Sequence, residues 1–100
     1  MRLWVEPSAL DEIAALPGHV RQRIRRAVSD LPKAPRPTNS RVLDIPEDMP
    51  IAGLEAHRLR IDSWRVLYVI DQEWEIITVL AVRKRPPYNY ADLRELLGRV

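Results

Sequence analysis

Apolar and polar positions alternate in short stretches along this chain, and the longest β-branched and aromatic runs lie between residues 55 and 83. Three segments there have the composition and length of β-strands: residues 55–61, 64–70 and 74–83. They are joined by Asp62-Ser63 and by residues 71–73, which are links of the length that hairpins use. Because a parallel crossover needs about a dozen or more residues, the sequence predicts a three-stranded antiparallel meander.

The N-terminal part has the pattern of a strand followed by two helices. Residues 2–6 alternate weakly and end at a proline, which fits a short edge strand. Ser8 is expected to cap a helix that has Asp11 and Glu12 in its first turn and ends at a Pro-Gly pair. Apolar residues then recur at helical spacing over residues 19–31, where a second helix is predicted.

The remaining segments complete the predicted fold. Prolines follow the second helix, residues 41–45 are expected to pair briefly, and residues 90–97 are expected to form a short helix. The sequence therefore predicts an α+β fold for a single domain of residues 1–100. Its order is an N-terminal strand, a helical hairpin, the antiparallel meander and a short C-terminal helix, with the hairpin packed on one face of the sheet.

The composition narrows the class of protein. One hundred residues suit one domain, and the absence of cysteine excludes disulfides and thiolate metal sites. No apolar stretch approaches the roughly 18 residues that cross a bilayer, and the N-terminus lacks a charged leader followed by an apolar run. A cytoplasmic protein without membrane contact is expected.

Arginine dominates the cations, with 14 arginines and 2 lysines. Its planar fork of donors suits bidentate contacts with phosphate or carboxylate groups. Residues 21–41 contain seven cations and Asp30 as their one acid, so this segment has a charge of about +6. Such a patch indicates a polyanionic partner, either nucleic acid or an acidic protein, although a solvated helix face would have the same composition. The seven cations are Arg21, Arg23, Arg25, Arg26, Lys33, Arg36 and Arg41.

Basic and phenolic side chains are expected to gather at the ends of the meander. Residues two apart in a strand face the same way, so Arg58 and Arg60 should share one face. The third strand ends in the cations of residues 83–85, and two prolines then stop ladder hydrogen bonding. Tyr88 and Tyr90 follow close to this strand end.

The segments L-R-I-D-S-W-R-V-L-Y and V-L-A-V-R-K-R, followed by a terminal segment with tyrosines, resemble the RelE/ParE family of bacterial toxin-antitoxin toxins, and its RelE-like branch more closely. The resemblance extends over nearly the whole chain. It implies a RelE/ParE-like fold and a metal-independent endoribonuclease, an mRNA interferase that cuts messenger RNA in the ribosomal decoding site without a cofactor. It also implies an acidic, co-encoded antitoxin as partner, with the free toxin a monomer and the silenced toxin a hetero-oligomer.

Matching the family's pattern position by position assigns roles to side chains. Arg65 and Arg85 would clamp the scissile phosphate, and Arg58 would bind and polarise nearby oxygens. Tyr88 or Tyr90 would stack on a base, orient it or handle a proton. The implied RNA-binding residues are Arg60, Arg83, Lys84, Arg21 and Arg25.

The sequence does not identify the general base. Arginine holds its proton too firmly for this role. His57 is the only nearby histidine, but strand alternation places it opposite Arg58 and Arg60.

Two other functions compete with a ribosome-dependent nuclease. The chain could instead be a ParE-like toxin that inhibits DNA gyrase by binding, or a non-catalytic relative that only binds an antitoxin. A binding-only toxin has no need of phosphate clamps, so placement of Arg58, Arg65 and Arg85 on different faces of the sheet would contradict the nuclease.

Several of these side chains have structural explanations as well. Arg65 could form an ion pair with Asp62 or Glu75 on the sheet face. The tyrosines near the C-terminus could simply pack the terminal helix. Three aromatic residues are expected in the core rather than in a site: Trp64, Tyr68 and Trp74.

Overall fold

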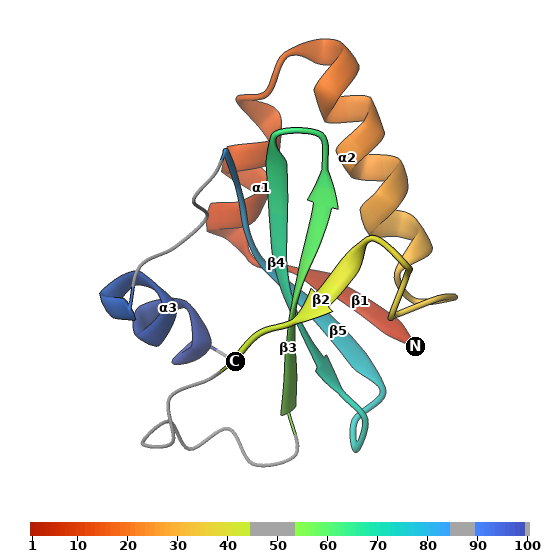
Figure 1. Cartoon of the computed structure of the whole chain (residues 1–100), viewed down its shortest axis with the longest axis vertical. Helices are drawn as coiled ribbons and strands as arrows, with labels where there is room; N and C mark the ends of the chain where they lie inside the picture. The colour runs from red at the N-terminus through yellow and green to blue at the C-terminus, as the bar shows by residue number, and fades with distance from the viewer. Residues whose placement is uncertain (45–53, 85–89, 100) are drawn as a thin grey trace.

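The computed structural model describes residues 1–44, 54–84 and 90–99, and for residues 90 and 91 the backbone alone. Figure 1 shows a twisted sheet with helices on both sides. The elements in chain order are β1 (Arg2–Val5), α1 (Pro7–Ala14), α2 (Gly18–Asp30), β2 (Ser40–Val42), β3 (Leu54–Ile61), β4 (Trp64–Asp71), β5 (Ile76–Lys84) and α3 (Tyr90–Leu97).

The five strands form one sheet in the order β1-β5-β4-β3-β2. β3, β4 and β5 are the predicted antiparallel meander. β1 lies at one edge and runs parallel to β5, with Leu3 opposite Ile77. β2 lies at the other edge and pairs antiparallel with β3, so the brief pairing expected after residue 40 is confirmed. The α+β fold predicted from the sequence is therefore the observed one.

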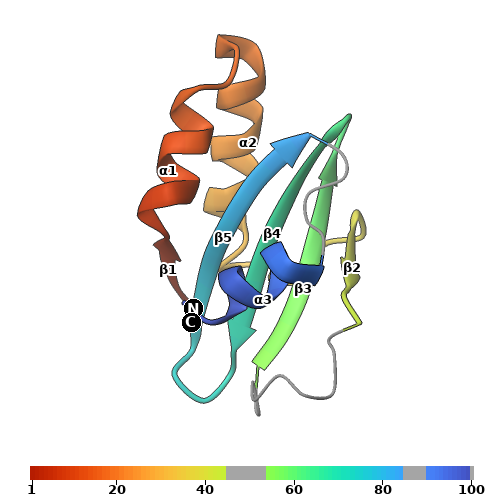
Figure 2. The same ribbon diagram turned by 90° about the vertical axis from the view of Figure 1, so that its left-hand side faces the viewer.

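The three helices of the described residues divide between the two faces of the sheet, as Figures 1 and 2 show. α1 and α2 cover one face, where the predicted helical hairpin is confirmed, and α3 lies across the other. The core under α1 and α2 includes Ile13, Ile24, Val28, Leu59, Val66 and Tyr68. The core under α3 includes Ala56, Leu67, Val69, Leu93, Leu96 and Leu97. Among the described residues, no helix is long and apolar enough to cross a membrane.

The first helix begins two residues earlier than the capping pattern predicts. Glu6 occupies the N-cap position, without a side-chain hydrogen bond, and Pro7 starts the helix. Proline is favoured in the first turn because its fixed φ suits the helix and its missing N–H would have no partner there. The prediction that Ser8 caps the helix is therefore wrong, and Asp11 and Glu12 lie beyond the first turn.

The link between β4 and β5 is longer than predicted. β4 continues to Asp71 and β5 begins at Ile76, so the connection covers residues 72–75. Asp71 Oδ1 accepts the Trp74 N–H at 3.1 Å, and Glu75 has a φ of 52°, which closes the turn. Trp74 is 66% exposed, so its expected place in the core is wrong, whereas Tyr68 is fully buried.

Candidate functional site

Arginines on adjacent strands face one another across the sheet. Arg60 lies opposite Arg65, and Arg65 lies opposite Arg83. On the outer side of β3, Arg58 lies opposite Arg41. Strand alternation places these side chains on the α3 face, the one that also holds Ala56 and Leu67. Like charges directly opposite each other destabilise a sheet, so this row favours an anionic partner.

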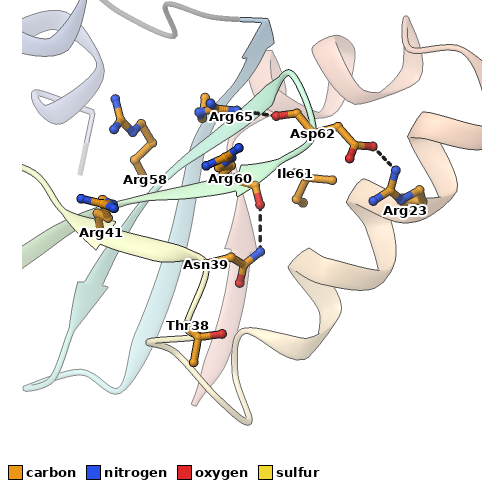
Figure 3. A pocket seen from close by; sticks show the side chains of 9 residues that line it. All are labelled: Arg23, Thr38, Asn39, Arg41, Arg58, Arg60, Ile61, Asp62 and Arg65. Carbon is orange, nitrogen blue, oxygen red and sulfur yellow. Dashed lines mark hydrogen bonds and ion pairs between the residues drawn. The ribbon is translucent and has the colours of Figure 1, made fainter.

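A cavity of about 660 Å³ lies at the β2 edge of the sheet, shown in Figure 3. Five arginines line it: four from this row and Arg23 from α2. The one carboxylate in its wall is Asp62, whose charge is already compensated by an ion pair with Arg23. A site with this excess of guanidinium groups has the charge and the planar donors that bind phosphate. Its lining is Arg23, Thr38, Asn39, Arg41, Arg58, Arg60, Ile61, Asp62 and Arg65.

Within the described part of the chain, three of the lining guanidinium groups have their donors available. Among the residues that the structure describes, none forms an ion pair or hydrogen bond with the guanidinium group of Arg41, Arg58 or Arg60. Arg60 is held through its backbone, because its carbonyl accepts the Asn39 side-chain N–H at 2.8 Å and its N–H donates to the Asn39 carbonyl at 2.9 Å. The loop before β2 thus holds the cavity wall through backbone atoms of Arg60 and does not engage its guanidinium group.

Arg65 differs from these three because it is buried, with 4% of its surface exposed. Its Nη1 donates to the backbone carbonyls of Asp62 and Trp64, each at 2.8 Å. These bonds hold the guanidinium against the β3–β4 hairpin, where Asp62 has a φ of 53°. The sequence left open an ion pair with Asp62 or Glu75, and the geometry instead anchors the group on carbonyl oxygens of the turn.

Arg83 is occupied by two carboxylates. Its Nε donates to Glu12 Oε2 at 2.8 Å, and its Nη1 forms an ion pair with Asp92. Burial lowers the pKa of Arg83, but the two carboxylates outweigh burial and the pKa is raised overall. Glu12 also accepts the Val82 N–H at 3.2 Å. Arg83, which the sequence assigns to RNA binding, therefore connects α1, β5 and α3.

His57 lies on the opposite face of the sheet from the cavity, as its alternation predicts. Its ring is buried and stacks on Tyr68, with 5.4 Å between ring centroids and an angle of 20° between planes. Neither ring nitrogen has a hydrogen-bond partner among the described residues, although Nε2 lies 3.3 Å from Glu55 Oε1. A base buried on this face cannot reach a ligand among the arginines.

The other predicted residues are dispersed. Arg21 donates to the Ala14 carbonyl at 3.4 Å, and neither Arg21 nor the exposed Arg25 lines the cavity. Lys84 is exposed at the end of β5. Arg85 and Tyr88 lie outside the described residues, and so does the side chain of Tyr90, which begins α3.

Sequence reasoning missed four residues that line the cavity: Arg23, Thr38, Asn39 and Arg41. The two arginines were recognised as part of a basic segment but not as part of a site. The expected pairing of residues 41–45 was the available signal, because Arg41 lies opposite Arg58 when this segment pairs with β3 in the observed register.

No protein-family model matches the chain, and no curated protein matches its sequence. The archaeal RelE-RelB complex from Pyrococcus horikoshii has a similar structure, with a TM-score of 0.71, 20% sequence identity, and coverage of 85% of this chain and 94% of that one. The toxin-antitoxin complex RelBE2 from Mycobacterium tuberculosis gives a TM-score of 0.66 and 22% identity, and covers 84% and 96%. The isolated E. coli RelE toxin gives a TM-score of 0.62 and 20% identity, and covers 98% and 96%. The chain therefore has the fold of the RelE toxins.

Proposed function

We propose that this protein is the toxin of a toxin-antitoxin system and acts as a metal-independent endoribonuclease on messenger RNA bound to the ribosome. One observation carries the proposal: Arg58, Arg60 and Arg65 share one face of two adjacent strands and line the same cavity. The placement that would contradict a phosphate clamp is Arg58, Arg65 and Arg85 on different faces; Arg58 and Arg65 share a face, and Arg85 lies outside the described residues. The RelE-like fold supports the same conclusion.

The reaction is internal transesterification of RNA. The 2′-oxygen forms a bond to the adjacent phosphorus while the bond from phosphorus to the 5′-oxygen breaks, which leaves a cyclic phosphate and a 5′-hydroxyl. The 2′-hydroxyl gives up a proton and the departing 5′-oxygen takes one. Negative charge grows on the phosphoryl oxygens in the transition state, and fixed cations stabilise it there.

The arginines divide this work according to their surroundings. Arg65 is held by carbonyl oxygens, so it presents a fixed edge to the scissile phosphate. The guanidinium groups of Arg58 and Arg60 have no partners among the described residues, and they bind the non-bridging oxygens. We place Arg41 beside them on a neighbouring phosphate. Donors of this kind contribute about 10²- to 10³-fold each in comparable sites.

Proton transfer falls to residues near the end of β5. His57 lies on the other face, and the carboxylate in the cavity wall, Asp62, is paired with Arg23. The resemblance to RelE-like toxins assigns the proton or stacking role to Tyr88 or Tyr90 and a second phosphate contact to Arg85. We retain these assignments as part of the proposal, and single substitutions of the two tyrosines decide between them.

The proposed partner is a co-encoded antitoxin of acidic character. Structures with this fold include RelE-RelB complexes from Pyrococcus horikoshii and Mycobacterium tuberculosis. An acidic segment would neutralise the row of arginines and exclude RNA from it. Co-expression with the neighbouring gene product and purification of a complex through a tag on one chain tests the partner, and a toxin that always elutes alone contradicts it.

The function is tested by inducing the protein in cells and mapping messenger RNA ends by primer extension. We expect growth arrest with cuts at fixed codon positions, both lost in Arg58→Ala combined with Arg60→Ala. Lys33→Ala serves as the matched control, because Lys33 is exposed and lines no part of the cavity. Arrest without cuts would favour gyrase or another binding target, and the absence of arrest would contradict toxicity.

A further inference from the structure

A second cavity, of about 530 Å³, lies between α2 and the end of β3. It shares Arg23, Asn39 and Ile61 with the arginine cavity on the sheet. The two cavities therefore adjoin at these residues, and we call them together the trough, which extends from the α3 face past the β3–β4 hairpin to α2. The remaining lining of the second cavity is His19, Gln22, Arg26, Ala27 and Asp30.

Two arginines, Arg23 and Arg26, and one carboxylate, Asp30, line the α2 part of this trough. Arg26 is exposed, and no residue in the described part of the chain forms an ion pair or side-chain hydrogen bond with it. Arg23 pairs with Asp62, but both side chains are more than half exposed, so the pair costs little to exchange for another anion. Arg23 therefore lies where a ligand passes from one cavity to the other.

The remaining walls suit unpaired nucleotides better than a bare anion. Ile61 and Ala27 offer apolar surface to the faces of bases, and the Gln22 amide can donate to and accept from base edges. Single-stranded sites elsewhere combine the same elements, namely cations along the backbone and surfaces against which bases lie. An acidic peptide would use the arginines but would leave the amide and apolar walls without a specific role.

We propose that Arg23 and Arg26 form a second phosphate-binding subsite, so that the RNA bound in the arginine cavity continues along α2. This inference rests on the proposed function and extends it from one scissile phosphate to a path of several nucleotides. The RNA backbone at the subsite belongs either to the message itself or to the ribosome. The inference differs from the sequence analysis, which assigned Arg21 and Arg25 on the same helix to RNA binding.

Binding of labelled RNA that carries 2′-O-methyl groups, and so cannot be cleaved, tests the subsite by fluorescence anisotropy. Two lengths are compared: about three nucleotides, which one cavity accommodates, and about ten, which is in the range of single-strand sites. Arg26→Ala should lower the affinity for the longer RNA about tenfold and leave the affinity for the shorter RNA nearly unchanged. It should also reduce the slope of log K against log salt by about 0.7 for the longer RNA.

Control variants distinguish RNA binding at the subsite from a nonspecific effect of the protein's positive charge. Lys33→Ala removes one positive charge outside both cavities and should leave both affinities and the salt slope unchanged. A loss with Arg25→Ala as large as with Arg26→Ala would overturn the trough, because Arg25 is exposed on the same helix and lines neither cavity. As a second arm of the experiment, the binding of the same variants to small ribosomal subunits without message is measured. A loss confined to that arm supports the subsite and identifies ribosomal RNA as its ligand.

The outcomes also separate this inference from the proposed function. If the wild type cleaves messages while Arg26→Ala binds every RNA as Lys33→Ala does, the nuclease stands and the subsite is overturned. If the wild type cleaves nothing but Arg26→Ala selectively loses the longer RNA or the ribosomal subunit, the nuclease fails and the subsite stands. A loss of affinity for an acidic antitoxin segment alone, with no change for RNA, would make the trough a protein site and overturn the inference.

Discussion

Arg58 and Arg83 lie on the same face of the sheet but have different surroundings. Arg83 has carboxylates from Glu12 and Asp92 against its guanidinium. Arg58 has no such partner among the described residues and opens into the cavity. The charge of Arg83 is used to hold elements together, whereas that of Arg58 remains available to a ligand. Residue type and strand position alone do not distinguish the two.

Arg58→Ala is expected to lower the rate of message cleavage by about 10²-fold or more, because a cation at the phosphoryl oxygens is lost. Arg58→Lys should restore part of the rate, since it returns the charge without the planar fork. The measurement is primer extension over time on translating ribosomes. Both variants should unfold at the wild-type denaturant concentration, and cleavage by Arg58→Ala at the wild-type rate would remove Arg58 from the site.

His57→Phe should leave cleavage unchanged and raise the free energy of unfolding by about 1 kcal/mol. Phenylalanine keeps the stacking on Tyr68 and removes two buried ring nitrogens; Nδ1 has no polar partner among the described residues, and Nε2 has only the 3.3 Å contact with Glu55 Oε1. Urea unfolding and the same primer-extension assay measure the two quantities. A folded variant that no longer cleaves would instead make His57 a participant in the reaction, despite its position on the other face.

Among the elements, the long segments were predictable and their ends were not. The meander follows from β-branched runs and short links, and α2 follows from a regular apolar stripe. The start of α1 was misassigned because the preference of Pro7 for the first helical position competes with the capping preference of Ser8. The β4–β5 turn was misassigned because Glu75 adopts a positive φ, which its residue type does not favour.

The terminal helix α3 is held by apolar packing and by the ion pairs of Arg83 with Glu12 and Asp92. Leu93, Leu96 and Leu97 pack on the sheet, and Arg83 reaches Asp92 on the helix. No sequence pattern indicated this link, because Glu12 and Asp92 are 80 residues apart in the chain and meet only through the fold.

Arg83→Met is expected to lower the free energy of unfolding by about 1 kcal/mol, a figure reduced for the partial exposure of the pair. The loss should be concentrated in α3, because Asp92 loses its partner on β5. Hydrogen exchange of the α3 amides should therefore accelerate more than that of the β3–β4 ladder. Arg99→Met is the comparison, since Arg99 also bonds to α1 and α3, through Ser8 and Glu95, but its carboxylate partner Glu95 is 68% exposed. Equal effects of the two changes would contradict a specific role for Arg83.

At the scale of the whole molecule, the candidate site is assembled from several segments, and the register between them determines which side chains come together. The face shared by Arg58 and Arg60 follows from a period of two and was predicted. Their meeting with Arg41 depends on the length of the loop after α2, and the trough depends on where the β3–β4 hairpin lies against α2. Local sequence contains no measure of these distances, so Arg23 and Arg26 could be recognised as basic but not as neighbours of the site.

The stability of the whole chain should depend on pH through Glu55, which joins β3 to the loop after α2. Hydrogen bonds from Arg36, at 3.0 and 2.6 Å, lower the pKa of Glu55 below its ordinary 4.5, against the opposing effect of burial. The unfolded chain therefore takes up this proton at a higher pH than the folded protein does. The stabilisation is complete above the ordinary pKa of Glu55 and is lost as the pH falls through the folded value.

Arg36→Gln tests this dependence, because it removes the main cause of the lowered pKa of Glu55. Its free energy of unfolding should lie below that of the wild type near pH 7, and the gap should narrow as the pH falls through the lowered pKa of Glu55 in the folded protein. Lys33→Gln removes the same charge from the same loop without an ion pair among the described residues, so its difference from the wild type should vary less with pH. A gap for Arg36→Gln that is constant in pH would mean that the residue stabilises the fold by packing rather than through the charge of Glu55.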